Sequence, residues 1–360
     1  MTFARIVPLP PNWFAAVMGT SIVATAAHSL PVGPPGLDAL AWAAWALAGA
    51  LLVAALAGTA AHLRADRAAL RGYLLDPAVA PFYGAPAMGL LAFGTATLLV
   101  APPRLGDAAL AIDVALWTAG TLLGLATAIG VPVLAFTRHR VPADAATGAW
   151  LMPVVPPMVS AAAGALLLPH LEGSAAQSMA LACYAMFGAS TLATLALLPQ
   201  VWSRLAHHGR GELRTVPTMW IVLGPLGQSV TAAGLLADHA GPALGVSERA
   251  LTLFALLYGI PVMGFALMWL AIAGGVTAVT VREGLPFSLA FWAFTFPVGT
   301  LVTGASSLAS HTGAAALDAL AVGLFALLLA GWTVAATGTV RHLRGVRRPV
   351  PGVPRDAVPA

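Results

Sequence analysis

The residues best suited to chemistry in this chain interrupt long apolar stretches. The segment FWAFTFPVGT, at 291–300, places four aromatic rings, a proline and a glycine in one stretch. Pro297 removes a backbone donor and kinks a helix, while Gly299 removes side-chain bulk from the next half turn. A ring at Phe296, or at Phe294 if the register differs, could therefore project into a pore as an apolar constriction that gates it. The alternative is that these rings pack between helices or against lipid.

Similar interruptions recur in other apolar stretches, where a proline precedes small and hydroxylated residues. Proline kinks are tolerated at membrane depth when neighbouring protein or a water-filled cavity satisfies the freed carbonyls. We therefore expect kinks facing a pore at Pro86, Pro156, Pro225 and Pro297. The expected pore lining is Gly19, Thr20, Gly89, Ser160, Gly227, Ser229, Gly299, Thr300 and Thr303. Close helix packing, which uses the same residue types, is the alternative.

Basic side chains lie at or just after the C-terminal ends of these apolar stretches, away from the prolines. If the kinked helices surround a pore, a positive outer vestibule is expected from His28, Arg104, His170, His239 and His311. Histidine, with an ordinary pKa of about 6.5, would make such a vestibule more positive in mild acid. The alternative is that these are polar caps at helix ends. Asp113 and Asp318 fall near outer helix starts, where snorkelling or capping is expected rather than proton relay.

The elements that must position these residues follow from composition. The 360 residues are 59% hydrophobic and 8% charged, far from the roughly 25% charged residues of soluble domains. About 20 apolar residues cross a bilayer as a helix, which predicts an all-α integral membrane protein. Ten apolar runs meet this length, approximately at 12–29, 39–61, 82–101, 108–137, 150–168, 175–203, 216–237, 250–279, 287–310 and 314–340.

The ten runs repeat as pairs. Odd-numbered runs begin about every 70 residues, which predicts five helical hairpins. Trp220 and Trp292 are each followed five residues later by a proline and seven later by a glycine. We expect the odd helices to form an inner pore ring and the even helices to face lipid. One transmembrane domain at 1–342 and a disordered, basic, proline-rich tail at 343–360 are predicted.

Arginine supplies all 17 basic residues, and its distribution predicts orientation. Fifteen arginines fall on one side of the ten runs, whereas only Arg104 and Arg249 fall on the other. The positive-inside rule then places both termini in the cytoplasm of a multi-pass protein in the cell membrane. Basic clusters spread between apolar runs fit this topology better than nucleic-acid binding, so no nucleic-acid partner is expected.

The sequence contains no HExxH, GxSxG or phosphate-binding glycine loop. We accordingly predict no catalytic residues, no cofactor and no metal site. The lone cysteine, Cys183, lies in an apolar run and is expected to pack there. A pore without fixed charge suits a monovalent or weakly hydrated anion.

The segments PNWFAAVMGTSIV near the start and FSLAFWAFTFPVGT in the ninth run resemble the tellurite-resistance/dicarboxylate transporter family. That family includes a bacterial tellurite-resistance permease, a fungal malate permease and the plant guard-cell slow anion channel. The resemblance covers about 10–343. It implies a homotrimer, a separate pore in each protomer, and an occluding phenylalanine in the ninth helix. It also implies that the substrates are small anions or dicarboxylates.

Several functions stay open at this point. An anion channel or permease is the main prediction. A proton-coupled transporter of C4-dicarboxylates such as malate, or a tellurite-resistance efflux permease, is the alternative that pore residues cannot separate from it. A membrane enzyme or receptor is a third class. The lipid bilayer is the expected surrounding in every case.

Overall fold

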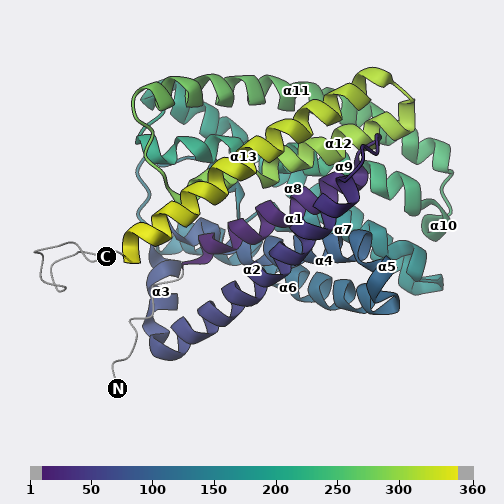
Figure 1. Cartoon of the computed structure of the whole chain (residues 1–360), viewed down its shortest axis with the longest axis horizontal. Helices are drawn as coiled ribbons and strands as arrows, with labels where there is room; N and C mark the ends of the chain where they lie inside the picture. Colours follow the sequence, from purple (N-terminus) through teal and green to yellow (C-terminus); the bar gives the residue numbers. More distant parts are fainter. Residues whose placement is uncertain (1–9, 348–360) are drawn as a thin grey trace, which may run out of the picture.

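The computed structural model describes residues 10–347, whose regular structure is entirely helical (Figure 1). Eight helical segments are long and apolar enough to cross a membrane. They are α2 (Leu37–Ala65), η2 with α4 (Ala80–Val100), α6 (Asp107–Thr137), α8 (Gly173–His208), η5 with α9 (Leu213–His239), α11 (Glu248–Arg282), η6 with α12 (Leu289–Thr312) and α13 (Ala315–Arg347). Here η marks a 3-10 segment.

Two shorter helices complete the bundle. They are α1 (Phe14–Ser29) and α7 (Pro156–Leu167), of 16 and 12 residues. Both are buried over almost their whole length. The small helices α3 (Arg67–Leu75), α5 (Pro102–Leu105) and α10 (Gly241–Leu244) lie in the connections between longer ones.

Burial divides the long segments into two groups. In the most apolar 18-residue stretches of Leu213–His239, Leu289–Thr312 and Ala80–Val100, 94%, 83% and 61% of the stretch is buried inside the protein. The corresponding stretches of α2, α6, α8, α11 and α13 are only 22–28% buried. Large apolar side chains stand exposed on this second group, among them Leu122, Leu192 and Leu257. Such faces are compatible with hydrocarbon but not with water, so the second group supplies the surface for lipid.

The buried helices contact one another in a closed order. Helix α1 contacts α4, α4 contacts α7, α7 contacts α9, α9 contacts α12, and α12 returns to α1. Each also packs on the long helix that follows it in the chain: α1 on α2, α4 on α6, α7 on α8, α9 on α11 and α12 on α13. We call α1, α4, α7, α9 and α12 the inner helices.

Every inner helix is preceded by a 3-10 segment. These segments are η1 (Pro11–Trp13), η2 (Ala80–Tyr83), η3 (Gly148–Leu151), η5 (Leu213–Val222) and η6 (Leu289–Phe294). The four prolines expected to kink these helices lie instead within the first three residues of an α-helix. In a first turn the missing N–H has no partner to lose. The sequence therefore specifies a junction between two helix types where a mid-helix kink was expected.

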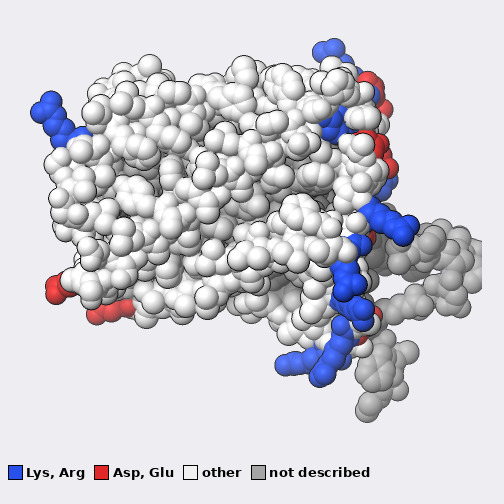
Figure 2. Space-filling model, turned by 180° about the vertical axis from the view of Figure 1, so that it is seen from behind, with Lys and Arg blue, Asp and Glu red and all other residues white. Residues whose placement is uncertain are grey.

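Charged side chains gather at the two ends of the molecule and leave a broad uncharged band between them (Figure 2). Most of the blue side chains lie along one edge in that view. This distribution is what the polar borders of a membrane protein require.

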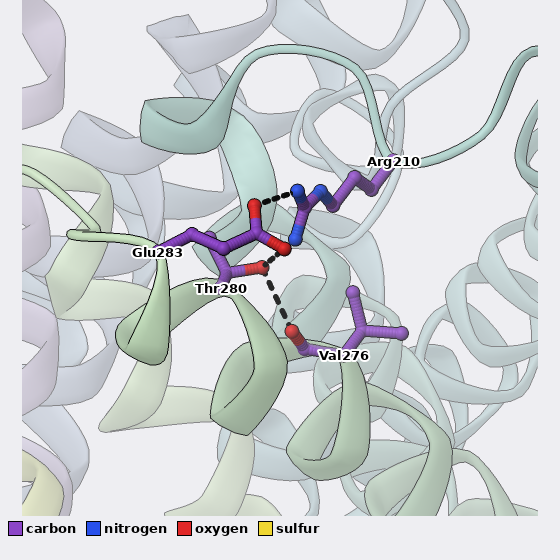
Figure 3. Close-up of polar contacts among 4 residues, drawn as sticks. All are labelled: Arg210, Val276, Thr280 and Glu283. Carbon is purple, nitrogen blue, oxygen red and sulfur yellow. Dashed lines mark hydrogen bonds and ion pairs between the residues drawn. The ribbon is translucent and has the colours of Figure 1, made fainter.

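One ion pair fixes a connection at a charged end (Figure 3). Arg210, in the turn after α8, pairs with Glu283 just beyond α11 and donates to Thr280 Oγ1 at 3.1 Å. Thr280 in turn donates to the carbonyl of Val276 at 2.8 Å. The turn that leads into η5 is thus tied to the end of α11.

The end of the last helix differs from the predicted domain boundary. Helix α13 continues to Arg347, past the expected limit at 342. The remainder of the expected tail, 348–360, lies outside the described residues.

Candidate anion pore

Two cavities lie among the inner helices, and each is lined by residues from all five of these helices or the segments leading into them. The cavity that includes His28 has a volume of about 240 Å³ and is called the outer cavity. The cavity that includes Asn12 has a volume of about 40 Å³ and is called the inner cavity. Apart from Phe296, the outer cavity is lined by residues farther along the inner helices than those at the inner cavity. The inner cavity is lined by the segments that precede these helices and by N-terminal residues of α1, α4, α9 and α12.

Among residues 10–347, Phe296 alone lines both cavities. It is the first residue of α12 and is 4% exposed. The preceding residue, Thr295, leaves helical geometry at φ −106° and ψ −80°, and its Oγ1 donates to the carbonyl of Trp292 at 2.6 Å. The break between η6 and α12 therefore sets the direction of the Phe296 ring.

Phe294 has different surroundings. Its ring lies 5.0 Å from Trp220 and 5.3 Å from Phe291, both in edge-on contact. It lines neither cavity. Phe291 also contacts Phe287, with the ring centroids 5.0 Å apart and the planes tilted by 53°, so these rings form a packed aromatic cluster.

Most glycines expected in the pore lining serve helix contacts. A Cβ added to Gly19 would collide with Thr295 and Trp292, so only glycine lets α1 approach the break before Phe296. A Cβ on Gly227 would meet the backbone of α12 at 2.6 Å, and one on Gly299 would collide with Ile22. Gly89 lies against Phe14. None of the four lines either cavity.

The expected hydroxyl lining divides in the same way. Thr303 lines the outer cavity, whereas Thr20, Ser160, Ser229 and Thr300 do not. Thr20 accepts from Trp332 Nε1 at 3.1 Å, and Ser160 accepts from Thr121 at 3.0 Å. Ser229 and Thr300 donate to carbonyls of their own helices. These hydroxyls are occupied in packing, which was the alternative interpretation.

The five basic residues expected at the outer mouth are not brought together. His28 lines the outer cavity, but Arg104 lies over the ring of Trp42, 3.8 Å from its centroid. His170 and His239 line neither cavity. His311 Nε2 contacts the Asp238 carboxylate at 2.8 Å, while its Nδ1 faces the Ser307 carbonyl at 2.8 Å. Asp238 itself lines the outer cavity, so the mouth contains an acid that the sequence argument omitted.

Several further polar lining residues were missed, among them Gln228 and Ser306. Gln228, 7% exposed, lines the outer cavity one turn inward of Thr231. Ser306, 6% exposed, lines it as well, and its Oγ has no hydrogen-bond partner. A glutamine inside an apolar run was the available signal, because buried polar groups in a membrane are costly.

Asp113 does not snorkel as expected. It is 1% exposed between α6 and Gly94 of α4, and neither carboxylate oxygen has a hydrogen-bond partner. It lines neither cavity. Over residues 10–347 no group of three or more His, Cys, Asp or Glu side chains is arranged to hold a metal ion. Cys183 is free and buried.

Several membrane-length apolar helices around a central cavity that is partly lined by hydroxyls are the architecture of a multi-pass membrane protein and are compatible with transport. The family model described as "Voltage-dependent anion channel" matches residues 8–340. The chain belongs to this anion channel family, which confirms the resemblance to the group containing the slow anion channel. Its function is the transport of anions across a membrane.

Individual relatives agree with this assignment. The chain is 26% identical to a sulfite efflux pump of Arthroderma otae and 27% identical to one of Trichophyton rubrum. Each match covers 92% of this chain and 89% of the relative. It is also 26% identical to an uncharacterized transporter of Methanocaldococcus jannaschii, over 92% of this chain and 93% of that protein.

Proposed function

We propose that the protein conducts small, singly charged anions along the axis enclosed by the inner helices, with Phe296 as the constriction. The observation that carries this proposal is the position of Phe296 between the outer and inner cavities. An apolar ring at a narrow point excludes water and so resists ions. The proposal includes no catalytic step.

The proposed architecture has ten membrane crossings arranged as five hairpins. It counts α1 and α7, together with the 3-10 segments before them, as two crossings beside the eight long segments. Supporting it, each inner helix packs on the next long helix, and the inner helices contact one another in a closed order. This arrangement makes the inner helices the pore wall.

The proposed setting is the cell membrane, with both termini in the cytoplasm and three protomers in the assembly. The arginine distribution supports the orientation. Since Cys183 is buried, single cysteines introduced elsewhere can report it without background. A cysteine at Glu212 should react only from the cytoplasm and one at Glu172 only from outside. The reverse pattern would overturn the orientation, and light scattering of the purified protein tests the trimer.

The substrate class follows from the cavity lining and the relatives. Within residues 10–347 no arginine lines either cavity, so mainly neutral donors replace the hydration of the ion. The cost of dehydration rises steeply with charge, which favours monoanions over dianions. Relatives named as sulfite efflux pumps support a small oxyanion. Proton-coupled C4-dicarboxylate transport and tellurite efflux are the competing functions.

Reconstitution into liposomes separates these functions. With a gradient of nitrate or chloride across the membrane, the current should reverse at the Nernst potential of the anion and be insensitive to an imposed proton gradient. A reversal potential that shifts with the proton gradient would establish coupled transport. Malate uptake that exceeds nitrate uptake would overturn the monoanion proposal.

A further inference from the structure

The outer cavity contains two kinds of polar side chain. Several hydroxyls already donate to helix carbonyls or to one another. The hydroxyl oxygens of Thr231 and Thr303 are 2.7 Å apart. Thr231 Oγ1 also lies 3.1 Å from the Gly227 carbonyl, and Thr303 Oγ1 lies 3.1 Å from the Thr300 carbonyl. Each hydroxyl has one proton to donate, so these protons are committed within the protein.

Gln228 and Ser306 differ from these hydroxyls. Both side chains are more than nine-tenths buried and both line the outer cavity. Ser306 Oγ has no hydrogen-bond partner, although a buried unpaired polar group costs free energy. Ser306 lines a cavity of about 240 Å³, but its Oγ is itself shielded from solvent, so it binds a ligand there only after its side chain rotates.

The two residues lie at different depths. Helices α9 and α12 run in the same direction, and Thr231 and Thr303 touch across them. Gln228 is three residues inward of Thr231, and Ser306 is three residues outward of Thr303. At about 1.5 Å per residue, their backbones are separated by roughly 9 Å along the axis. Gln228 is thus the donor nearer to Phe296.

We propose that Ser306 and Gln228 form two successive binding stations, and that Gln228 selects singly charged oxyanions that retain a proton, such as hydrogensulfite. This inference rests on the proposed function. The Gln228 amide offers both an N–H₂ donor and a carbonyl acceptor. The donor binds an anionic oxygen while the acceptor takes the O–H of the same ion.

Gln228 forms fewer hydrogen bonds with other anions. A halide or nitrate has no proton for the amide carbonyl, so that oxygen would lose its partner inside the cavity. Sites built around a substrate hydroxyl reject analogues that lack it. A dianion brings a second charge to a cavity without arginine and with the carboxylate of Asp238 at its mouth. Ser306, a hydroxyl alone, assists any monoanion.

The test compares hydrogensulfite with nitrate, which has the same charge but no proton, in proteoliposomes at mildly acidic pH. The Gln228→Leu substitution should lower the permeability ratio of hydrogensulfite to nitrate by roughly tenfold, because about one good hydrogen bond to hydrogensulfite is lost. Ser306→Ala should slow both ions to a similar extent and leave the ratio unchanged.

The matched control is Ser229→Ala, next to Gln228 on α9. Its hydroxyl is equally buried, donates to the Leu226 carbonyl and lines neither cavity, so the ratio should stay at the wild-type value. Gln228→Met provides a second apolar replacement if Gln228→Leu fails to fold. An unchanged ratio in a folded apolar variant would overturn this inference. Absence of any anion flux in the wild-type protein would instead overturn the proposed function.

Discussion

The outer and inner cavities share the same five helices but differ in chemistry and size. The outer cavity has a volume of about 240 Å³ and is lined in part by hydroxyls, an amide, a histidine and the carboxylate of Asp238. The inner cavity has a volume of about 40 Å³ and is lined mainly by Met, Ala, Phe and Pro, with one amide, Asn12. An anion thus meets its hydrogen-bond donors on one side of Phe296 and a narrow apolar passage on the other. If Phe296 is the constriction, as proposed, the barrier to conduction includes this inner passage as well as the ring.

Removal of the Phe296 ring should have the largest effect on the difference between the outer and inner cavities. Phe296→Ala should join the two cavities and raise anion current on the order of tenfold, because the dewetted constriction is lost. Currents from proteoliposomes, normalised to folded protein, measure the change. Phe294→Ala is the matched control, since Phe294 packs in the aromatic cluster and lines neither cavity. A rise from Phe294→Ala alone would move the constriction to that residue.

Widening the inner cavity should have the next largest effect. In the Phe296→Ala background, Met18→Ala should increase the current a further few-fold, roughly, because the remaining apolar passage would hold water more readily. Met263→Ala is the control: Met263 is equally buried, lines neither cavity and should lose similar stability without added current. Equal currents in the two variants would mean that the ring is the whole barrier.

The acid at the outer mouth should matter less. Asp238→Asn removes a negative charge from the outer cavity and should raise inward anion current by about twofold at low ionic strength. The gain should shrink in high salt, where charges at the surface are screened. Asp107→Asn changes net charge equally but lines neither cavity, so it should leave the current unaltered.

The smallest effect is expected at the ion pair that ties the turn before η5 to α11. The side chains of Arg210 and Glu283 are 29% and 44% exposed, so Arg210→Ala should reduce stability by about 0.5 kcal/mol. Thermal unfolding in detergent measures this change. Because η5 contributes Ile221 to the inner cavity, a rise in current would mean that the ion pair also keeps that cavity narrow.

The sequence predicts the membrane helices well but predicts their rotation poorly. Apolar length and arginine borders follow from the bilayer itself, so the all-helical fold could be anticipated. Which face of an inner helix meets the axis depends on contacts between helices distant in the chain. Gly19 illustrates this: its small size suggested pore lining, but it accommodates Thr295 and Trp292.

The candidate site was therefore predictable only in part. Pro297 and Gly299 directed attention to Phe296, whose surroundings can be traced to the break at Thr295. Ser306 stayed unnoticed because nothing in a single sequence distinguishes a hydroxyl with a partner from one without. Gln228 was a glutamine inside an apolar run, a signal that the sequence argument did not use. Asp238 was overlooked because its pairing with His311 joins residues from two different helices.

The shared direction of the inner helices has an electrostatic consequence. Four of them, α1, α4, α9 and α12, present N-terminal residues to the inner cavity, and α7 begins directly after Val155, which lines it. The outer cavity is lined by residues farther along all five helices. Peptide dipoles add along a helix to about half a positive charge at its N-terminal end. Five parallel macrodipoles thus place a positive potential around the narrow apolar passage, which favours anions over cations there. Because this field belongs to the backbone, titration of side chains cannot remove it.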